Sequence, residues 1–187
     1  MKKQISILAL SLSLISFGVD AQHSHTKEKN QTSEKAAAKA NPEFSKQLEA
    51  VYKANLDLNE AFVASDAQKV KAAVKPVKDA VAKVNMNLLK DKAHQDWMDY
   101  SKDMDKSLKQ IEDAENIKEQ RKHFSTYNES LYKSIKAFGL GGEEAYFQHC
   151  PMALNNEGAS WISNSKEIKN PYFGDKMLKC GVIKETL

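Results

Sequence analysis

Residues 70–88 read VKAAVKPVKDAVAKVNMNL, and this stretch decides the fold class. Apolar residues recur at alternating intervals of four and three, which places them in one stripe on one face of an α-helix. The stripe consists of Val70, Val74, Val77, Val81, Val84 and Leu88. Asp66 precedes the stripe as an N-cap. Pro76 lies inside it, so we expect a kink or a local break there, because proline removes one helical hydrogen bond and clashes with the preceding turn.

Three further stretches have the same periodicity. One begins at Asn41-Pro42-Glu43, with an asparagine cap and proline at the first helical position. Its inner face carries Phe44, Leu48, Val51, Leu58 and Phe62. Another starts near Ala93, with Trp97, Met104, Leu108 and Ile111 on its inner face. The last runs from about Asn116 to Gly139, with Ile117, Phe124, Leu131, Ile135 and Phe138. Four amphipathic helices with short connections predict an up-down four-helix bundle.

Three polar residues occupy core-facing slots of these stripes: Asn55, Arg121 and Asn128. Such residues either set the register inside a bundle or lie at its open end. Arg121 is equally able to reach over the C-terminal segment. We expect the three residues to lie at the open end, although the sequence alone does not place Arg121.

Beyond Gly141-Gly142 the helical periodicity stops. Residues 145–150, 160–163 and 182–186 read as short extended pieces, separated by turns at 155–158 and 164–171. We therefore expect a mainly α fold in which a small irregular or β-like C-terminal lobe, about residues 143–187, packs on the bundle. Residues 42–187 form one domain in this interpretation.

The N-terminus has the features of a cleavable export signal. Lys2 and Lys3 precede an apolar run that is interrupted only by serines, and Ala21 ends a small-residue cleavage site. We expect a signal peptide at 1–21 and a disordered tether at 22–41, rich in Lys, Glu, Ser, Asn and Ala. No later apolar run is long enough to cross a bilayer, so the mature chain is expected to be periplasmic.

Charge and motifs narrow the function class. The full chain has a net charge of +3, and loss of the signal peptide removes two lysines and one aspartate. A nearly balanced charge argues against a nucleic-acid surface. The chain has no paired Glu-x-x-His for a di-iron site, no Cys-x-x-Cys-His for haem and no phosphate-binding loop. We therefore expect a protein that is not an enzyme.

Both cysteines lie in the C-terminal lobe, and each has a methionine nearby: Cys150-x-Met152 and Met177-x-x-Cys180. Thiolate and thioether donors together favour soft ions such as Cu(I) or Ag(I). His149 is a reserve ligand, available if the segment is a loop rather than a strand. The alternative is a Cys150–Cys180 disulfide, the usual fate of two cysteines in an exported protein, with both methionines as core residues. Composition favours the disulfide slightly.

The tail residues 146–153, Trp161 and 166–181 contain the motifs Cys150-Pro-Met-Ala, Asn170-Pro-Tyr-Phe-Gly and Met177-x-x-Cys-Gly. This tail closely resembles the domain of unknown function 3347 family, exported bacterial domains found alone or fused to periplasmic adaptor subunits of copper and silver efflux pumps. The resemblance extends to Gln120-Arg121-x-x-Phe124 and more loosely to the helices. It implies periplasmic metal handling with Cys150, Met152, Met177 and Cys180 as ligands, and an efflux-pump adaptor as the partner.

Overall fold

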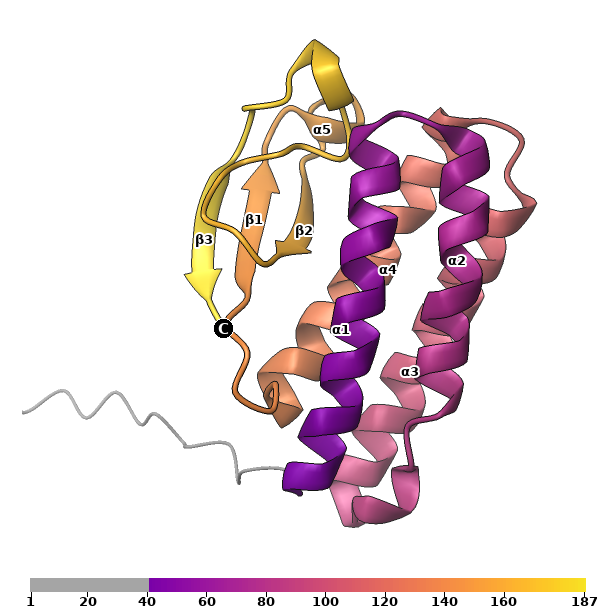
Figure 1. Cartoon of the computed structure of the whole chain (residues 1–187), viewed down its shortest axis with the longest axis vertical. Helices are drawn as coiled ribbons and strands as arrows, with labels where there is room; N and C mark the ends of the chain where they lie inside the picture. Colours follow the sequence, from indigo (N-terminus) through magenta and orange to yellow (C-terminus); the bar gives the residue numbers. More distant parts are fainter. Residues whose placement is uncertain (1–40) are drawn as a thin grey trace, which may run out of the picture. The chain divides into compact units, whose positions relative to one another are not determined.

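The computed structural model describes residues 41–187; the predicted signal peptide and all of the predicted tether except Asn41 lie outside them. Four long helices form the bundle: α1 (Pro42–Val63), α2 (Ala67–Ala82), α3 (Asp91–Asp113) and α4 (Ile117–Phe138). Each helix packs against the next one in sequence, and α1 also packs against α4, so the four close into an up-down bundle (Figure 1). The predicted bundle is confirmed. Within residues 41–187, none of the helices combines the length and apolarity that a membrane span requires.

The predicted helix ends are confirmed by their caps. Asn41, Asp66 and Asn116 each accept a hydrogen bond from the backbone N–H two residues further along. These bonds satisfy donors that have no partner inside the first helical turn. At the other end of α4, Gly139 has φ of 71°, a conformation that glycine adopts without steric cost.

The apolar stripe at residues 70–88 is not a single helix along its whole length. α2 stops at Ala82, and a single 3-10 turn, η1 (Met86–Leu88), follows. The Asn85 side chain accepts a hydrogen bond from the Asn87 N–H at 3.1 Å, and such local bonds compete with helix continuation. Val84 is nevertheless buried. The spacing therefore predicted burial correctly beyond the point where the helix ends.

We expected a kink or a local break at Pro76, and the break does not occur, because α2 continues through this position. Pro76 lies on the exposed side of the helix, between the buried Val74 and Val77. The apolar face on either side of it is thus anchored in the core. Tertiary packing outweighs the cost of one missing hydrogen bond.

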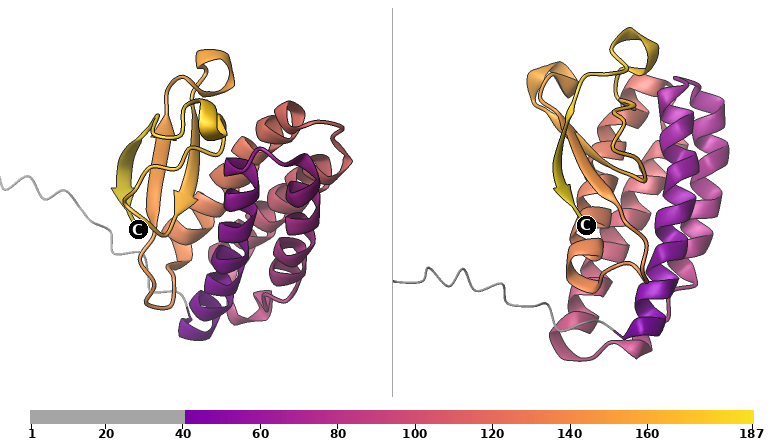
Figure 2. Two further views of the ribbon diagram at one scale, coloured as in Figure 1. Left: turned by 45° about the horizontal axis from the view of Figure 1, so that its top comes forward. Right: turned by 60° about the vertical axis from the view of Figure 1, so that its left-hand side comes forward.

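The C-terminal lobe contains three short antiparallel strands, β1 (Tyr146–Cys150), β2 (Ala159–Ser163) and β3 (Val182–Thr186), in the order β2-β1-β3. They match the three predicted extended pieces within one residue. The connections hold a short turn, α5 (Ala153–Asn156), and a 3-10 turn, η2 (Gly174–Lys176). Figure 2 shows the sheet beside α1 and α4, with β2 nearest to the helices.

The outer edge of β2 docks on the bundle through Ile162. The N–H of Ile162 donates to Asn128 Oδ1 at 3.2 Å, and its carbonyl accepts from the side-chain amides of Asn55 and Asn59. Two residues earlier in β2, the backbone carbonyl of Ser160 accepts a hydrogen bond from the Tyr172 hydroxyl at 2.7 Å. A strand edge carries unpaired backbone groups that must find partners when buried. Helix side chains supply them here. The expectation that Asn55 and Asn128 lie at the open end of the bundle is therefore wrong, because both are fully buried against β2.

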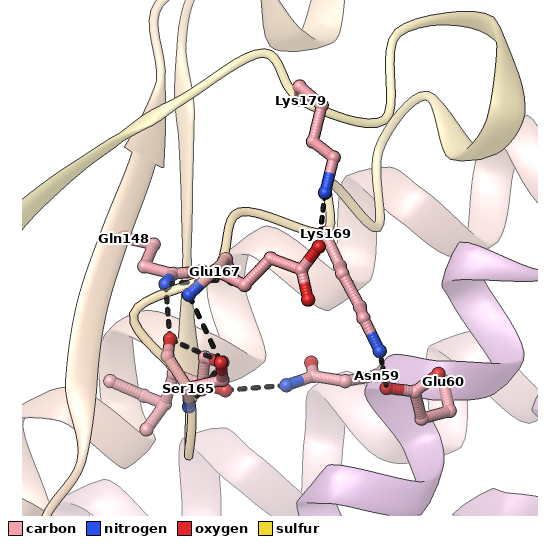
Figure 3. A network of polar contacts seen from close by, with 9 residues as sticks. Asn59, Glu60, Gln148, Ser165, Glu167, Lys169 and Lys179 are labelled. Atoms are coloured by element: carbon pink, nitrogen blue, oxygen red, sulfur yellow. Dashed lines mark hydrogen bonds and ion pairs between the residues drawn. The ribbon is translucent and has the colours of Figure 1, made fainter.

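The face of the sheet that carries Gln148 is covered by the segment after β2. Gln148 is fully buried and its side-chain amide donates to the carbonyls of Ser165 and Glu167 (Figure 3). Two ion pairs of the same network connect this covering segment to α1 and to the segment that carries Cys180. Lys169 pairs with Glu60 of α1 at 3.8 Å, and Lys179 pairs with Glu167. The segment that carries Cys180 is thus fastened to the cover of the sheet.

Replacement of Asn128 by alanine should lower the free energy of unfolding by about 1–3 kcal/mol, because the buried Ile162 N–H loses its acceptor. Urea unfolding of the two proteins measures the difference. Asn164→Ala removes an exposed amide from the same lobe and should change stability by less than about 0.5 kcal/mol. Equal effects of the two substitutions would show that the Asn128 contact does not hold the lobe.

Replacement of Pro76 by alanine should raise the free energy of unfolding by up to about 3 kcal/mol, since alanine restores the missing helical hydrogen bond. Pro42→Ala is the matched control, because Pro42 occupies the first position of α1, where proline costs no bond. Thermal unfolding of both variants tests the contrast. A Pro76 variant no more stable than the Pro42 variant would contradict it.

Candidate functional site

Cys150 ends β1 and lies opposite Ala159 of β2. Its side chain is on the same face of the sheet as those of Tyr146 and Gln148, because side chains alternate along a strand, and it is fully buried. The face is closed by the segment that follows β2. A thiol in this place is a small apolar group unless a second soft group reaches it.

The pairing of β1 with β3 brings the second cysteine to the first. His149 pairs with Val182, so the antiparallel register places Gly181 opposite Cys150 and Cys180 one residue further along. Gly181 crosses close over the sheet. A Cβ at this position would come within 2.8 Å of the Trp161 ring, which only a glycine avoids.

The backbone of Cys180 is fixed by two hydrogen bonds. Its N–H donates to the Met177 carbonyl at 3.0 Å, and its carbonyl accepts from the Asn170 side chain at 2.6 Å. The Asn170 Oδ1 also accepts from the N–H of Tyr172 and of Phe173. Asn170 is fully buried. One asparagine therefore shapes the Asn-Pro-Tyr-Phe turn and holds the Cys180 arm against it.

The Cys150 side chain lies close enough to Cys180 to influence its ionisation, and both cysteines are free. The Cys150 side chain raises the pKa of Cys180 to about 11, and partial desolvation acts in the same direction. Cys180 is partly exposed, whereas Cys150 is inaccessible. An entering ion or oxidant thus reaches the pair through Cys180.

The other predicted ligands are placed differently. Met177 is partly buried and lies in the same turn as Cys180. Met152, two residues after Cys150, is 47% exposed. His149 is on the opposite face of β1 from Cys150, and its Nδ1 lies 2.9 Å from the Ser160 hydroxyl. Burial and the nearby Lys184 lower the pKa of His149. The structure brings the two cysteines together, keeps Met177 near one of them and directs His149 away.

The donor set bears on which ions the site fits. Within residues 41–187 no group of three or more His, Cys, Asp or Glu side chains is arranged to hold a metal ion. The four-ligand pattern of a structural zinc site is thus missing from this part of the chain. Two neighbouring thiols, with Met177 in the same turn as one of them, are donors of the kind that soft monovalent ions prefer.

One feature near the pair, the turn at residues 154–156, had no clear sequence signal. Leu154, Asn155 and Asn156 have φ of 50°, 61° and 70°, a left-handed turn that costs about 1–2 kcal/mol per ordinary residue. This strained turn comes directly after the Cys150-Pro151-Met152 step. The asparagines are the only hint, since this residue type tolerates such φ values.

Arg121 links the bundle to the cysteine arm. Its guanidinium donates to the Pro171 carbonyl at 2.7 Å, to the Phe62 carbonyl and to the Ser65 hydroxyl. Burial lowers the pKa of this group. Of the placements that the sequence left open, the reach over the C-terminal segment is the one observed. A groove of about 610 Å³ lies beside it, between α4 and the strained turn.

The comparisons with known proteins point to a family without an assigned activity. The family model for "Protein of unknown function (DUF3347)" matches residues 51–143. This range takes in most of the four helices and ends before β1, so it excludes the tail motifs. No curated protein and no solved structure matches the chain. Through its helical part, the chain belongs to the DUF3347 family.

Proposed function

We propose that this protein binds a soft monovalent ion, Cu(I) or Ag(I), through the thiolates of Cys150 and Cys180. The observation that carries the proposal is the closeness of these two side chains, which come from segments about thirty residues apart and are brought together by the β1–β3 register. The register of β1 with β3, the tight crossing at Gly181 and the Asn170 clamp all hold them there. Thiolates are the protein donors that Cu(I) prefers.

Met177 is the best candidate for a third donor. It lies in the turn that fixes Cys180, and the long thioether side chain is flexible enough to swing toward an ion. Met152 is exposed and follows Pro151, so it is available as a fourth donor from the other arm. His149 stays in reserve, because its ring faces Ser160 across the sheet.

Proton release accompanies binding in this proposal. The pKa of Cys180 is about 11, so the thiol is protonated at neutral pH and the ion must displace its proton. Affinity should therefore increase with pH up to about that value. The depth of Cys150 would protect a bound ion from water and oxidant.

The cellular setting rests on sequence. The predicted signal peptide supports export to the periplasm, and the resemblance of the tail to domains fused to adaptor subunits supports a role beside a heavy-metal efflux pump. In this setting the protein would pass the ion to the periplasmic adaptor or sense it there. The family match itself is silent about metals.

A second candidate uses the same contact. Adjacent thiols in an oxidising compartment can form a disulfide, which would close a loop of about thirty residues and stabilise the lobe by roughly 3–4 kcal/mol in the loop-entropy model. The protein would then be a stapled scaffold that binds a partner in the envelope. Oxidation and Cu(I) binding exclude each other, so the redox state would gate the metal site.

Cu(I) binding should be measured anaerobically on the reduced protein, in competition with a coloured Cu(I) chelator. We expect one tightly bound ion per chain, and at least a hundredfold loss of affinity in Cys150→Ser and in Cys180→Ser, because each removes one of two thiolates. Met177→Leu should weaken binding less. Met104→Leu, in the bundle core, is the volume-matched control and should leave affinity unchanged.

Two results would overturn the metal proposal. One is unchanged Cu(I) affinity in either serine variant that still unfolds cooperatively. The other is a permanent Cys150–Cys180 disulfide, resistant to mild reductant, in protein taken from the periplasm. The second result would establish the scaffold instead.

The thiol contact has a separate test in alkylation of Cys180 by iodoacetamide as a function of pH. Only the thiolate reacts, so the rate should rise through a midpoint near pH 11. Cys150→Ala removes the neighbour that raises the pKa, so its midpoint should move to lower pH and its rate at pH 8.5 should increase. Identical profiles for the two proteins would show that the thiols do not touch.

A further inference from the structure

Two methionines are unusually exposed on the helical bundle. Met86 of η1 and Met98 of α3 are 40% and 42% exposed, and in the described part of the bundle they are the large apolar side chains that water reaches most. Both line one groove of about 610 Å³ between the end of α2 and the first turns of α3. The end of α2 and the start of α3 lie at the lower end of the bundle in Figure 1. The groove shares no residue with the cysteine pair.

A histidine is oriented by the same turn. His94 Nδ1 lies 3.1 Å from the backbone carbonyl of Met86. A carbonyl only accepts, so Nδ1 must carry the proton, and the neutral ring then has its lone pair on Nε2. Donation of one ring N–H to a backbone carbonyl is the arrangement that usually supports a metal-binding histidine.

The three residues lie near one another in the fold. His94 and Met98 are four residues apart in α3 and therefore lie on one face, one turn from each other. Met86 is joined to His94 by the hydrogen bond through its own carbonyl. The connection between α2 and α3 thus brings one histidine and two methionines to one end of the bundle. The two methionines line the groove, and His94 adjoins it through its bond to the Met86 carbonyl.

We propose that His94 Nε2 and the thioether sulfurs of Met86 and Met98 form a second site for Cu(I) or Ag(I). All three donors are uncharged, which suits a soft monovalent ion and offers little to Ca²⁺ or Mg²⁺. Two acidic and two basic residues, Asp99, Asp105, Lys78 and Lys102, also line the groove, so the surroundings are close to neutral. Trp97 is nearly buried and forms an apolar wall.

This site is independent of the cysteine pair. It needs no thiolate, and it would bind without releasing a proton from a thiol. Neutral donors hold Cu(I) less tightly than thiolates, so a strong chelator would strip this site and leave the cysteine site loaded. The surface site would exchange its ion readily.

The test is an Ag(I) titration of protein labelled with ¹³C at the methionine methyl groups, followed by NMR. The chain has six methionines, so each site is read separately in one experiment. We expect the Met86 and Met98 signals to shift together, with the second equivalent of Ag(I) when both cysteines are present and with the first equivalent in a Cys150→Ser/Cys180→Ser background. Met104, fully buried in the core, should not move.

His94→Gln should weaken the response of both methionines at least tenfold. His123→Gln, which alters another partly exposed histidine of the bundle, is the matched control and should leave the titration unchanged. Thermal unfolding checks that both variants fold. The proposal is overturned if Met86 and Met98 do not shift, if they titrate with different midpoints, or if His94→Gln has no effect. Loss of the Met177 response alone would count against the cysteine site and not against this one.

Discussion

The backbone of Ile162 is the point on which the arrangement of the lobe depends. Its N–H and C=O leave the sheet at the outer edge of β2 and are bound by Asn128 of α4 and by Asn55 and Asn59 of α1. Buried backbone groups without partners cost about 1–3 kcal/mol each. The strand can therefore pack on the bundle only in the register that presents this residue to the asparagines.

The docking of Ile162 also determines where the two cysteines lie. Docking of β2 fixes β1, β1 pairs with β3, and the register of β3 sets where Cys180 meets Cys150. A second path runs through Arg121, which binds the Pro171 carbonyl next to the Asn170 clamp on Cys180. The helices thus hold both arms of the thiol pair, although they contribute no thiol themselves. This explains how a site in the tail depends on a bundle that forms the family's matched region.

The sequence predicted the features that depend on the periodicity of apolar residues. The four apolar stripes gave the bundle, and the three extended pieces gave the strands. It could not predict the contacts between residues that are distant in the chain. Asn55 and Asn128 have the same spacing whether they face another helix or a strand edge, and their partner Ile162 is distant in sequence. The thiol contact depends on the β1–β3 register, which shifts between Phe147 and Gln148 and has no local signature. The exposed Met86 could not be linked to His94 while its turn read as part of a helix.

Native-state hydrogen exchange at the Ile162 amide tests the central claim most directly. This N–H points away from β1, so strand pairing alone does not protect it, and only the bond to Asn128 does. If the lobe is held through this contact, the amide should exchange only by global unfolding, as slowly as the core amides of α4. Exchange as fast as that of an exposed strand amide would show that the lobe moves freely on the bundle and that the helices do not position the cysteine pair.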